Sequence, residues 1–316
     1  MSLTTWFHGY QVYDTQYFEE DIVDTNADDI YTPGSGTDAK FISKAATLSL
    51  GVSPGITPVY GGYGRRPYAI ETTVDTCGIA LDFPLRSTES ITFLDYLVNA
   101  PDGAGTCNRA LSLVTKMTDG SKTYYFSVKH ARPLSGAIIY ASGILSASIR
   151  FSCHYNAFST TIPTNWQIAA DPGVVASPFI HSYDGGADCW TIAEQNGPTS
   201  YNPVVEGAVL RFNNTLDIVP DGTHRSGWSD NPVSEQHLSG AITIAAKSTS
   251  DEWKAFWDGI YAGYYWDIDW TILPGTHTFA ADDVKFESPE IPAPSRIGPR
   301  ALPLTIVSCL GPVVLA

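Results

Sequence analysis

The sequence predicts a mainly β protein built from two tandem β-sandwich or half-barrel domains, each with one flanking α-helix. Aromatic residues make up 12% of the chain, and 27 Gly and 21 Pro supply many turns, a composition that favours strands joined by tight connections. One stretch in each half has helical periodicity. These two stretches and their flanking strands recur in the same order, which indicates a duplicated chain.

The clearest element is a strand, a capped turn and a helix between Leu238 and Tyr261. Ser248 is an N-cap candidate because its hydroxyl can accept an amide hydrogen bond, and Asp251 is favourable beside the positive end of a helix. Large apolar residues then recur at helical spacing, which places them on one face: Trp253, Phe256, Trp257, Ile260 and Tyr261.

A similar unit occurs earlier in the chain. Gly78–Leu81 is a β-prone run, Arg86–Ser90 offers helix-start residues, and apolar residues follow at helical spacing: Ile91, Leu94, Leu97 and Val98. Phe93–Leu97 aligns with Phe256–Ile260. Four further matches keep the same order, at offsets of about 155 to 162 residues: Ala46–Leu50 with Ala208–Phe212, Gly78 with Gly240, Gly120–Tyr124 with Gly275–Phe279, and Ile149–Cys153 with Thr305–Cys309.

The repeat predicts an N-terminal arm over residues 1–39, a first β domain over 40–153, a linker over 154–202 and a second β domain over 203–316. The expected first-domain strands lie near Phe41–Leu50, Ala69–Thr73, Gly78–Phe83, Thr123–His130 and Ala147–Cys153. The linker is rich in Pro and Gly, which predicts a looped connection. The acidic, aromatic arm is either flexible or docks on a neighbouring subunit.

The charge and the cysteine content of the chain limit the functions that it could have. The formal net charge of −15, from 33 acidic and 18 basic residues, cannot supply the broad basic face with which proteins grip duplex DNA. Five cysteines without metal-like spacing favour reduced thiols in a cytoplasmic setting. Met1–Thr5 does not resemble a signal peptide, and the apolar segment Leu302–Ala316 is too short and Pro-interrupted to span a bilayer. No membrane insertion is therefore expected.

Residues that could support catalysis or metal binding form no complete site. Asp267 and Asp269 share one face of an expected strand, but they lack an identifiable acid/base partner for glycoside hydrolysis. Asp184–Asp188 resembles a loose calcium loop without the remaining oxygen ligands. The seven His residues lack zinc-binding spacing, and nucleophile-elbow and phosphate-loop motifs are absent. The sequence therefore predicts no enzyme activity, no cofactor and no metal.

The repeated unit, with its Gly-led strand, Ser/Thr-capped helix and closing strand ending in Ser-Cys, resembles the tail tube, or major tail, proteins of long-tailed double-stranded DNA viruses. The resemblance covers roughly residues 40–153 and 203–316 and is best over Gly78–Leu97 and Gly240–Ile260. It implies a structural virion protein whose rings stack into the tube through which the viral genome passes. A doubled chain implies homotrimeric rings with pseudo-sixfold symmetry.

The same resemblance implies partners, location and contact surfaces. The partners are further copies of the chain and other tail proteins, with double-stranded DNA as non-specific passing cargo. The location is the virion tail, after synthesis and assembly in the host cytoplasm. Lumen-lining candidates are Asp82, Asp267, Asp269, Asp282 and Asp283, because an acidic wall repels phosphate. Subunit-interface candidates, from the arm and the loops at 51–67 and 221–237, are Trp6, Phe7, Tyr10, Tyr13, Tyr17, Tyr60, Tyr63 and Trp228.

Two other functions remain open from sequence. Eight Trp and seventeen Tyr are compatible with a carbohydrate-binding or receptor-binding β-sandwich module of a virion or extracellular protein. A hydrolase on a β scaffold would use Asp267 or Asp269. Exposed Trp clusters in a monomer would favour the first, and turnover lost in Asp269→Asn would favour the second.

Overall fold

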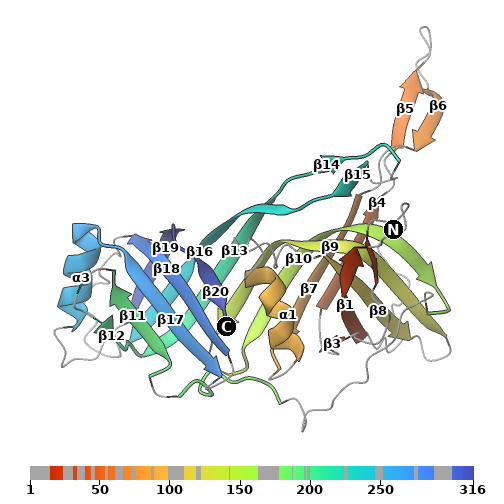
Figure 1. Ribbon diagram of the computed structural model, residues 1–316. Coiled ribbons are helices and arrows are strands. Elements are labelled where there is room, and N and C mark those ends of the chain that lie inside the picture. The colour runs from red at the N-terminus through yellow and green to blue at the C-terminus, as the bar shows by residue number, and fades with distance from the viewer. Residues whose placement is uncertain are drawn as a thin grey trace.

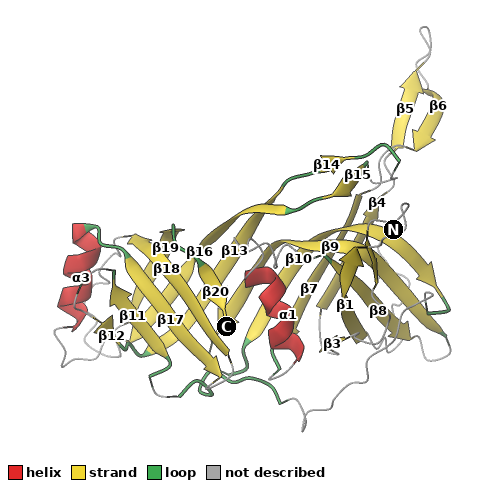
Figure 2. Ribbon diagram, viewed as in Figure 1, coloured by secondary structure: helices red, strands yellow, loops and turns green. Residues whose placement is uncertain are grey.

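The computed structural model describes residues 15–23, 31–33, 40–43, 47–53, 56–60, 67–72, 76–86, 89–98, 110–118, 122–141, 143–162, 178–186, 188–195, 197, 200–223, 227–245, 252–273, 277–287 and 301–316. Within these residues the fold is mainly β, with two helices, α1 (Glu89–Val98) and α3 (Glu252–Ala262) (Figure 2). The predicted mainly β class is confirmed, and the two tandem β-sandwich or half-barrel domains stay a prediction.

The first half contains six strands in one antiparallel order. The order is β1 (Thr15–Val23), β8 (Leu111–Thr118), β9 (Thr123–Tyr140), β10 (Ser146–Ser159), β7 (Thr76–Pro84) and β4 (Thr47–Ser53). Helix α1 follows β7 along the chain.

The second half has the same order of pairing. Its six strands are β11 (Trp190–Glu194), β17 (Trp266–Leu273), β18 (His277–Glu287), β19 (Ala301–Cys309), β16 (Val233–Ala245) and β13 (Val205–Leu216), and α3 follows β16. Each of these six strands and the helix thus has a counterpart at the same position in the first half.

The remaining strands are short. β2 (Tyr31–Pro33) and β3 (Lys40–Ser43) pair with β1, β12 (Ser200–Tyr201) pairs with β11, and β20 (Val313–Leu315) pairs with β18. Two hairpins also occupy equivalent places: β5 (Ile56–Tyr60) with β6 (Pro67–Thr72) lies between β4 and β7, and β14 (Val219–Pro220) with β15 (Trp228–Asp230) lies between β13 and β16. Figure 1 shows the β5–β6 hairpin projecting from the body.

The two halves share one continuous sheet. Strand β13 pairs with the C-terminal part of β9, from Ala208 opposite Tyr140 to Asn213 opposite Ser135. Strand β9 is therefore bordered by β10 on one side and by both β8 and β13 on the other.

The core lies on the face of the sheet that carries the helices. Alternate residues of β7 and β16, such as Leu81 and Ile242, are buried there. Gly136 permits α1 to approach, since a Cβ at this position would lie 2.6 Å from a methyl carbon of Leu97. The Phe256 ring of α3 stacks on Trp266 with centroids 4.5 Å apart.

The predicted apolar face of α3 is only partly correct. Phe256 and Ile260 are buried, whereas Trp257 is half-buried and Tyr261 is 81% exposed. The helix covers the edge region near β17 with a narrow stripe, so the last residue of the periodic pattern points to solvent.

The segments outside the predicted domains also contain strands. Residues Thr15–Val23 of the arm form β1 on the edge of β8 in the same chain. Strand β10 continues past Cys153 to Ser159, and Trp190–Glu194 of the predicted linker form β11 on the edge of β17. The linker is therefore less loop-like than predicted, and its strand occupies the place that β1 has in the first half.

Candidate functional site: the helix-free face of the sheet

The face of the sheet opposite the helices, here called the helix-free face, is formed by the side chains that alternate with the core. Directly paired residues of antiparallel strands lie on one face, so rows can be followed across β7, β10, β9, β13 and β16. One row is Asp82, Ser148, Ala137, Arg211 and Ser239, and the next is Ala80, Arg150, Ser135, Asn213 and His237.

Most of these side chains are small or polar. A third row contains Ser146, Ile139, Val209, Ala241 and Thr305. All members of the three rows are exposed or half-buried, in contrast with the buried residues that alternate with them. The central part of the helix-free face is therefore mostly small and polar, with Ile139 and Val209 as the larger apolar side chains of the three rows.

Two cations lie on this face that the sequence analysis did not select. Arg150 stands between Ile149 and Phe151, and Arg211 stands between Leu210 and Phe212. Both arginines are exposed while their neighbours are buried. The period-two alternation around each arginine was the signal that could have placed them on the helix-free face.

Four of the predicted lumen-lining aspartates lie close together on β17 and β18. Asp267 Oδ1 accepts a hydrogen bond of 3.1 Å from the backbone amide of Asp283, which has a positive φ of 55° at a register shift between these strands. Burial and the nearby charges of Asp267, Asp269 and Asp283 raise the pKa of Asp282. Burial and Asp267 likewise raise the pKa of Asp269. The four carboxylates therefore repel one another.

The fifth candidate, Asp82, is remote from this acidic cluster of Asp267, Asp269, Asp282 and Asp283. It is exposed on β7, which is separated from β18 by β10, β9, β13, β16 and β19. The helix-free face thus has acidic groups near both ends and Arg150 and Arg211 between them, a more mixed distribution than the acidic stripe expected. Whether these aspartates line a lumen stays a prediction.

The interface candidates fall into three groups. Trp6, Phe7, Tyr10, Tyr13 and Tyr63 lie outside the described residues. Tyr17 belongs to β1, with its backbone opposite Val114 and Phe41, and Tyr60 ends β5. Trp228 is half-buried in its own chain, where its ring lies 3.7 Å from the ring of His154 and 5.6 Å from that of His130, between centroids.

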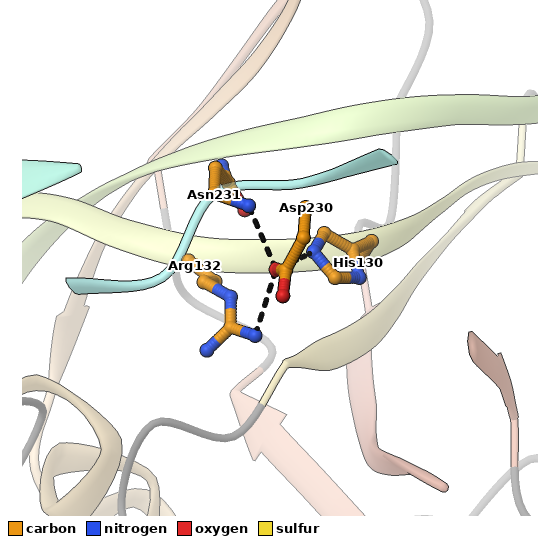
Figure 3. A network of polar contacts seen from close by, with 4 residues as sticks. All are labelled: His130, Arg132, Asp230 and Asn231. Atoms are coloured by element: carbon orange, nitrogen blue, oxygen red, sulfur yellow. Dashed lines mark hydrogen bonds and ion pairs between the residues drawn. The ribbon is translucent and has the colours of Figure 1, made fainter. Parts of the chain in front are cut away.

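The ring of Trp228 contacts His130, which belongs to a polar cluster that sequence reasoning missed. Figure 3 shows the four residues of this cluster, His130, Arg132, Asp230 and Asn231. Asp230 Oδ1 on β15 lies 2.8 Å from His130 Nε2. The same oxygen accepts a hydrogen bond of 3.0 Å from an Arg132 guanidinium nitrogen and one of 2.7 Å from the backbone amide of Asn231. His130 and Arg132 are buried on β9, and His130 has a positive φ of 52°. Because 98 and 100 residues separate these partners from Asp230, no local pattern could have indicated the cluster.

The electrostatics of this cluster favour a charged carboxylate. Burial alone would raise the pKa of Asp230, but the hydrogen bond with His130 and the charge of Arg132 outweigh it and lower the pKa to about 2. A buried cation beside an ionised carboxylate is a structural arrangement that holds β15 on β9. Arg132 lies opposite Ser152, so the contact between β15 and β9 lies on the helix-free face at one end of the sheet.

The described part of the chain contains side chains of the types that ligate metals, and two helices. Its His, Cys, Asp and Glu side chains form no group of three or more arranged to hold a metal ion. In the predicted calcium-loop alternative, Asp184 Oδ2 instead accepts a hydrogen bond from the His181 amide. Neither helix among the described residues has the length and hydrophobicity required to cross a membrane.

Comparisons with known proteins give no family assignment. The chain matches no family model, and no curated protein is similar to it.

Proposed function

We propose that this protein is a structural subunit of a viral tail tube, in which copies of the chain form rings that stack around the path of the genome. The observation that carries the proposal is the repeated strand order: β1-β8-β9-β10-β7-β4 recurs as β11-β17-β18-β19-β16-β13, and the two sets join edge to edge through β9 and β13. A unit that pairs with its own repeat is suited to pair with further copies.

The repeat supports two tandem domains produced by duplication. Helices α1 and α3 follow equivalent strands, and the β5–β6 and β14–β15 hairpins interrupt equivalent strand pairs. The counterpart of arm strand β1 is β11, so the duplicated unit extends into the segments predicted as arm and linker. Each domain then contributes a six-stranded part of one sheet.

The strand edges suggest how copies would associate. One edge of β13 is occupied by β9, whereas β4, its counterpart, pairs with β7 alone among the described strands. An open edge of this kind invites pairing with another strand. If the pairing of β9 with β13 were repeated between copies, β18 of one chain would pair with β4 of the next chain, because β18 is the counterpart of β9 and β4 is the counterpart of β13. Such a heterologous contact closes into a ring when the rotation permits, and three two-domain chains would give pseudo-sixfold symmetry.

The helix-free face has properties suited to a passage wall. Small and polar side chains form its central rows, and the acidic cluster adds local negative charge to a chain with a net charge of −15. A polyanion passing within a Debye length of about 8 Å at physiological salt is repelled by such groups. The five aspartates outnumber the exposed Arg150 and Arg211 on this face, so DNA would be cargo that the wall repels on balance.

Negative-stain microscopy and mass photometry of the purified chain test the proposal, with rings or tubes expected. Two proline variants in β4 sharpen the test. The β4–β7 register is unbroken, so the backbone amides of Ser49 and Val52 point to opposite edges. In one of the variants Ser49→Pro and Val52→Pro, the lost amide is one that bonds to β7, so thermal stability falls. In the other variant, the lost amide lies on the open edge, so the monomer stays folded but rings no longer form. Rings in both folded variants, or globules in the unmodified protein, would contradict the proposal.

The carbohydrate-binding or receptor-binding alternative receives less support. Trp190, Trp266 and Trp270 are each 1% exposed, and Trp228 and Trp257 are half-buried, so the described Trp side chains offer no exposed stacking platform. Isolated globules that bind immobilised glycans would favour this function. Turnover abolished by Asp269→Asn would favour the hydrolase.

A further inference from the structure

Two cysteines from neighbouring strands meet at one end of the β7–β10 pair. Ser152 of β10 lies directly opposite Gly78 of β7, and the next residues in the two antiparallel strands are Cys153 and Cys77. Their sulfur atoms are 3.4 Å apart, with the Cys153 thiol donating to Cys77 Sγ. Both are free thiols; Cys153 is buried and Cys77 is half-buried.

We propose that Cys77 and Cys153 form a redox-sensitive modification site, which closes to a cross-strand disulfide when the protein meets a small disulfide oxidant such as oxidised glutathione. Closure requires the sulfur atoms to approach from 3.4 Å to about 2.05 Å, a change within the reach of small side-chain rotations. This inference goes beyond the proposed assembly and does not depend on it.

The different burial of the two thiols sets the order of the reaction. The hydrogen bond to Cys77 and burial both raise the pKa of Cys153, so Cys153 stays protonated, while Cys77 is the thiol that solvent reaches. The Cys77 thiolate attacks the oxidant, forming a mixed disulfide and releasing one thiolate. The released thiolate takes the proton of Cys153, and the Cys153 thiolate then attacks Cys77 Sγ and expels the second thiolate. Two protein thiols are oxidised, and one small disulfide is reduced to two thiols.

The bond would join two strands that lie far apart in the sequence. It would close a loop between residues 76 positions apart, and cross-links over loops of this length restrict the unfolded chain. Strand β7 also pairs with β4. The disulfide would therefore fasten the part of the sheet that carries the open β4 edge whenever the protein meets an oxidising medium.

The test uses the full chain, purified in reductant and then incubated with oxidised glutathione. Peptide mapping by mass spectrometry without reduction should find Cys77 linked to Cys153, with the loss of two titratable thiols. The midpoint of thermal unfolding should rise by roughly 5 °C and return after reduction.

Matched variants separate this chemistry from general oxidation. Cys153→Ser should retain glutathione on Cys77, Cys77→Ser should give no product at Cys153, and Cys189→Ser should leave the link unchanged. Cys153→Val, which keeps an apolar group in the buried position, repeats the first variant if serine prevents folding. A mixed disulfide on Cys77 that persists in the unmodified protein, a link to another cysteine, or unreactive thiols would overturn the inference.

Discussion

Arg132 on β9 and Asp230 on β15 lie 3.0 Å apart, although 98 residues separate them in the sequence. The Arg132 side chain is almost fully buried, whereas that of Asp230 is 26% exposed. The carboxylate of Asp230 therefore contributes a negative charge beside a buried guanidinium. The pair fixes the β14–β15 hairpin of the second half on a strand of the first half, and so couples the stability of the two halves.

Replacing Asp230 with asparagine should destabilise the protein. The Asp230→Asn variant removes the negative charge 3.0 Å from the buried Arg132 guanidinium, and we expect a loss of about 2–4 kcal/mol in the free energy of unfolding, allowing for partial solvent exposure. Urea denaturation measures the change. Asp217→Asn, at an exposed position on the same hairpin, is the control and should change stability by less than about 0.5 kcal/mol.

The same carboxylate should give the stability a dependence on acid pH. The pKa of Asp230 is about 2 in the folded protein, below its ordinary value of 3.8. A lowered pKa adds stability above the unfolded-state value, and this contribution is lost as pH falls from about 4 towards 2. The unfolding free energies of the unmodified protein and Asp230→Asn should therefore converge over that window. A difference between them that stays constant from pH 6 to pH 2.5 would contradict the assignment.

Neutralising the acidic cluster should have the opposite effect. Burial and neighbouring carboxylates raise the pKa of Asp282, so its charged form costs stability at neutral pH. Asp282→Asn should raise the midpoint of thermal unfolding at pH 7 by up to about 2 °C. The gain should vanish at pH 3, where the carboxyl is protonated in both states. Asp82→Asn, which also removes one negative charge but lies on a distant strand, is the matched control.

Gly240 is a site where a side chain cannot be accommodated. Its φ is 145°, and an added Cβ would collide with the backbone oxygen of Val209. Gly240→Ala should therefore lower the unfolding free energy by roughly 3 kcal/mol or more, through strain in the β13–β16 pair. Gly222→Ala is a suitable control because an added Cβ there meets nothing within 4 Å. Equal stability of the two variants, measured by urea denaturation, would show that the strand relaxes around the new methyl group.

Local patterns predicted the helices and most strands well. The helical spacing of Ile91 to Val98 corresponds to helix Glu89–Val98, and the expected strand Gly78–Phe83 lies within Thr76–Pro84. These elements follow from apolar periodicity and capping residues, which are short-range properties. Strand β9 was predicted to end at His130 but continues to Tyr140, because pairing with β10 and β13 supports a segment that contains Pro133.

The alignment of the two halves of the sequence was less accurate at the level of single residues. Gly78 was matched with Gly240, yet Gly240 lies on the core face and Gly78 alternates with the core residues Ile79 and Leu81. A shift of one residue reverses the face of every side chain in a strand. Pairing between halves, the acidic cluster and the Asp230 contacts depend on such long-range register, and could not be predicted from neighbours along the chain.

The position of β9 also affects synthesis. The C-terminal part of β9 pairs with β13, which lies about 70 residues further along the chain. At typical translation rates of 5–20 residues per second, β13 is synthesised roughly 4–14 seconds after β9. During this interval the edge of the C-terminal part of β9 is unpaired and accessible to other nascent chains on the same polysome. Synonymous codons that slow elongation between residues 140 and 208 should therefore increase the insoluble fraction without any change in the protein itself.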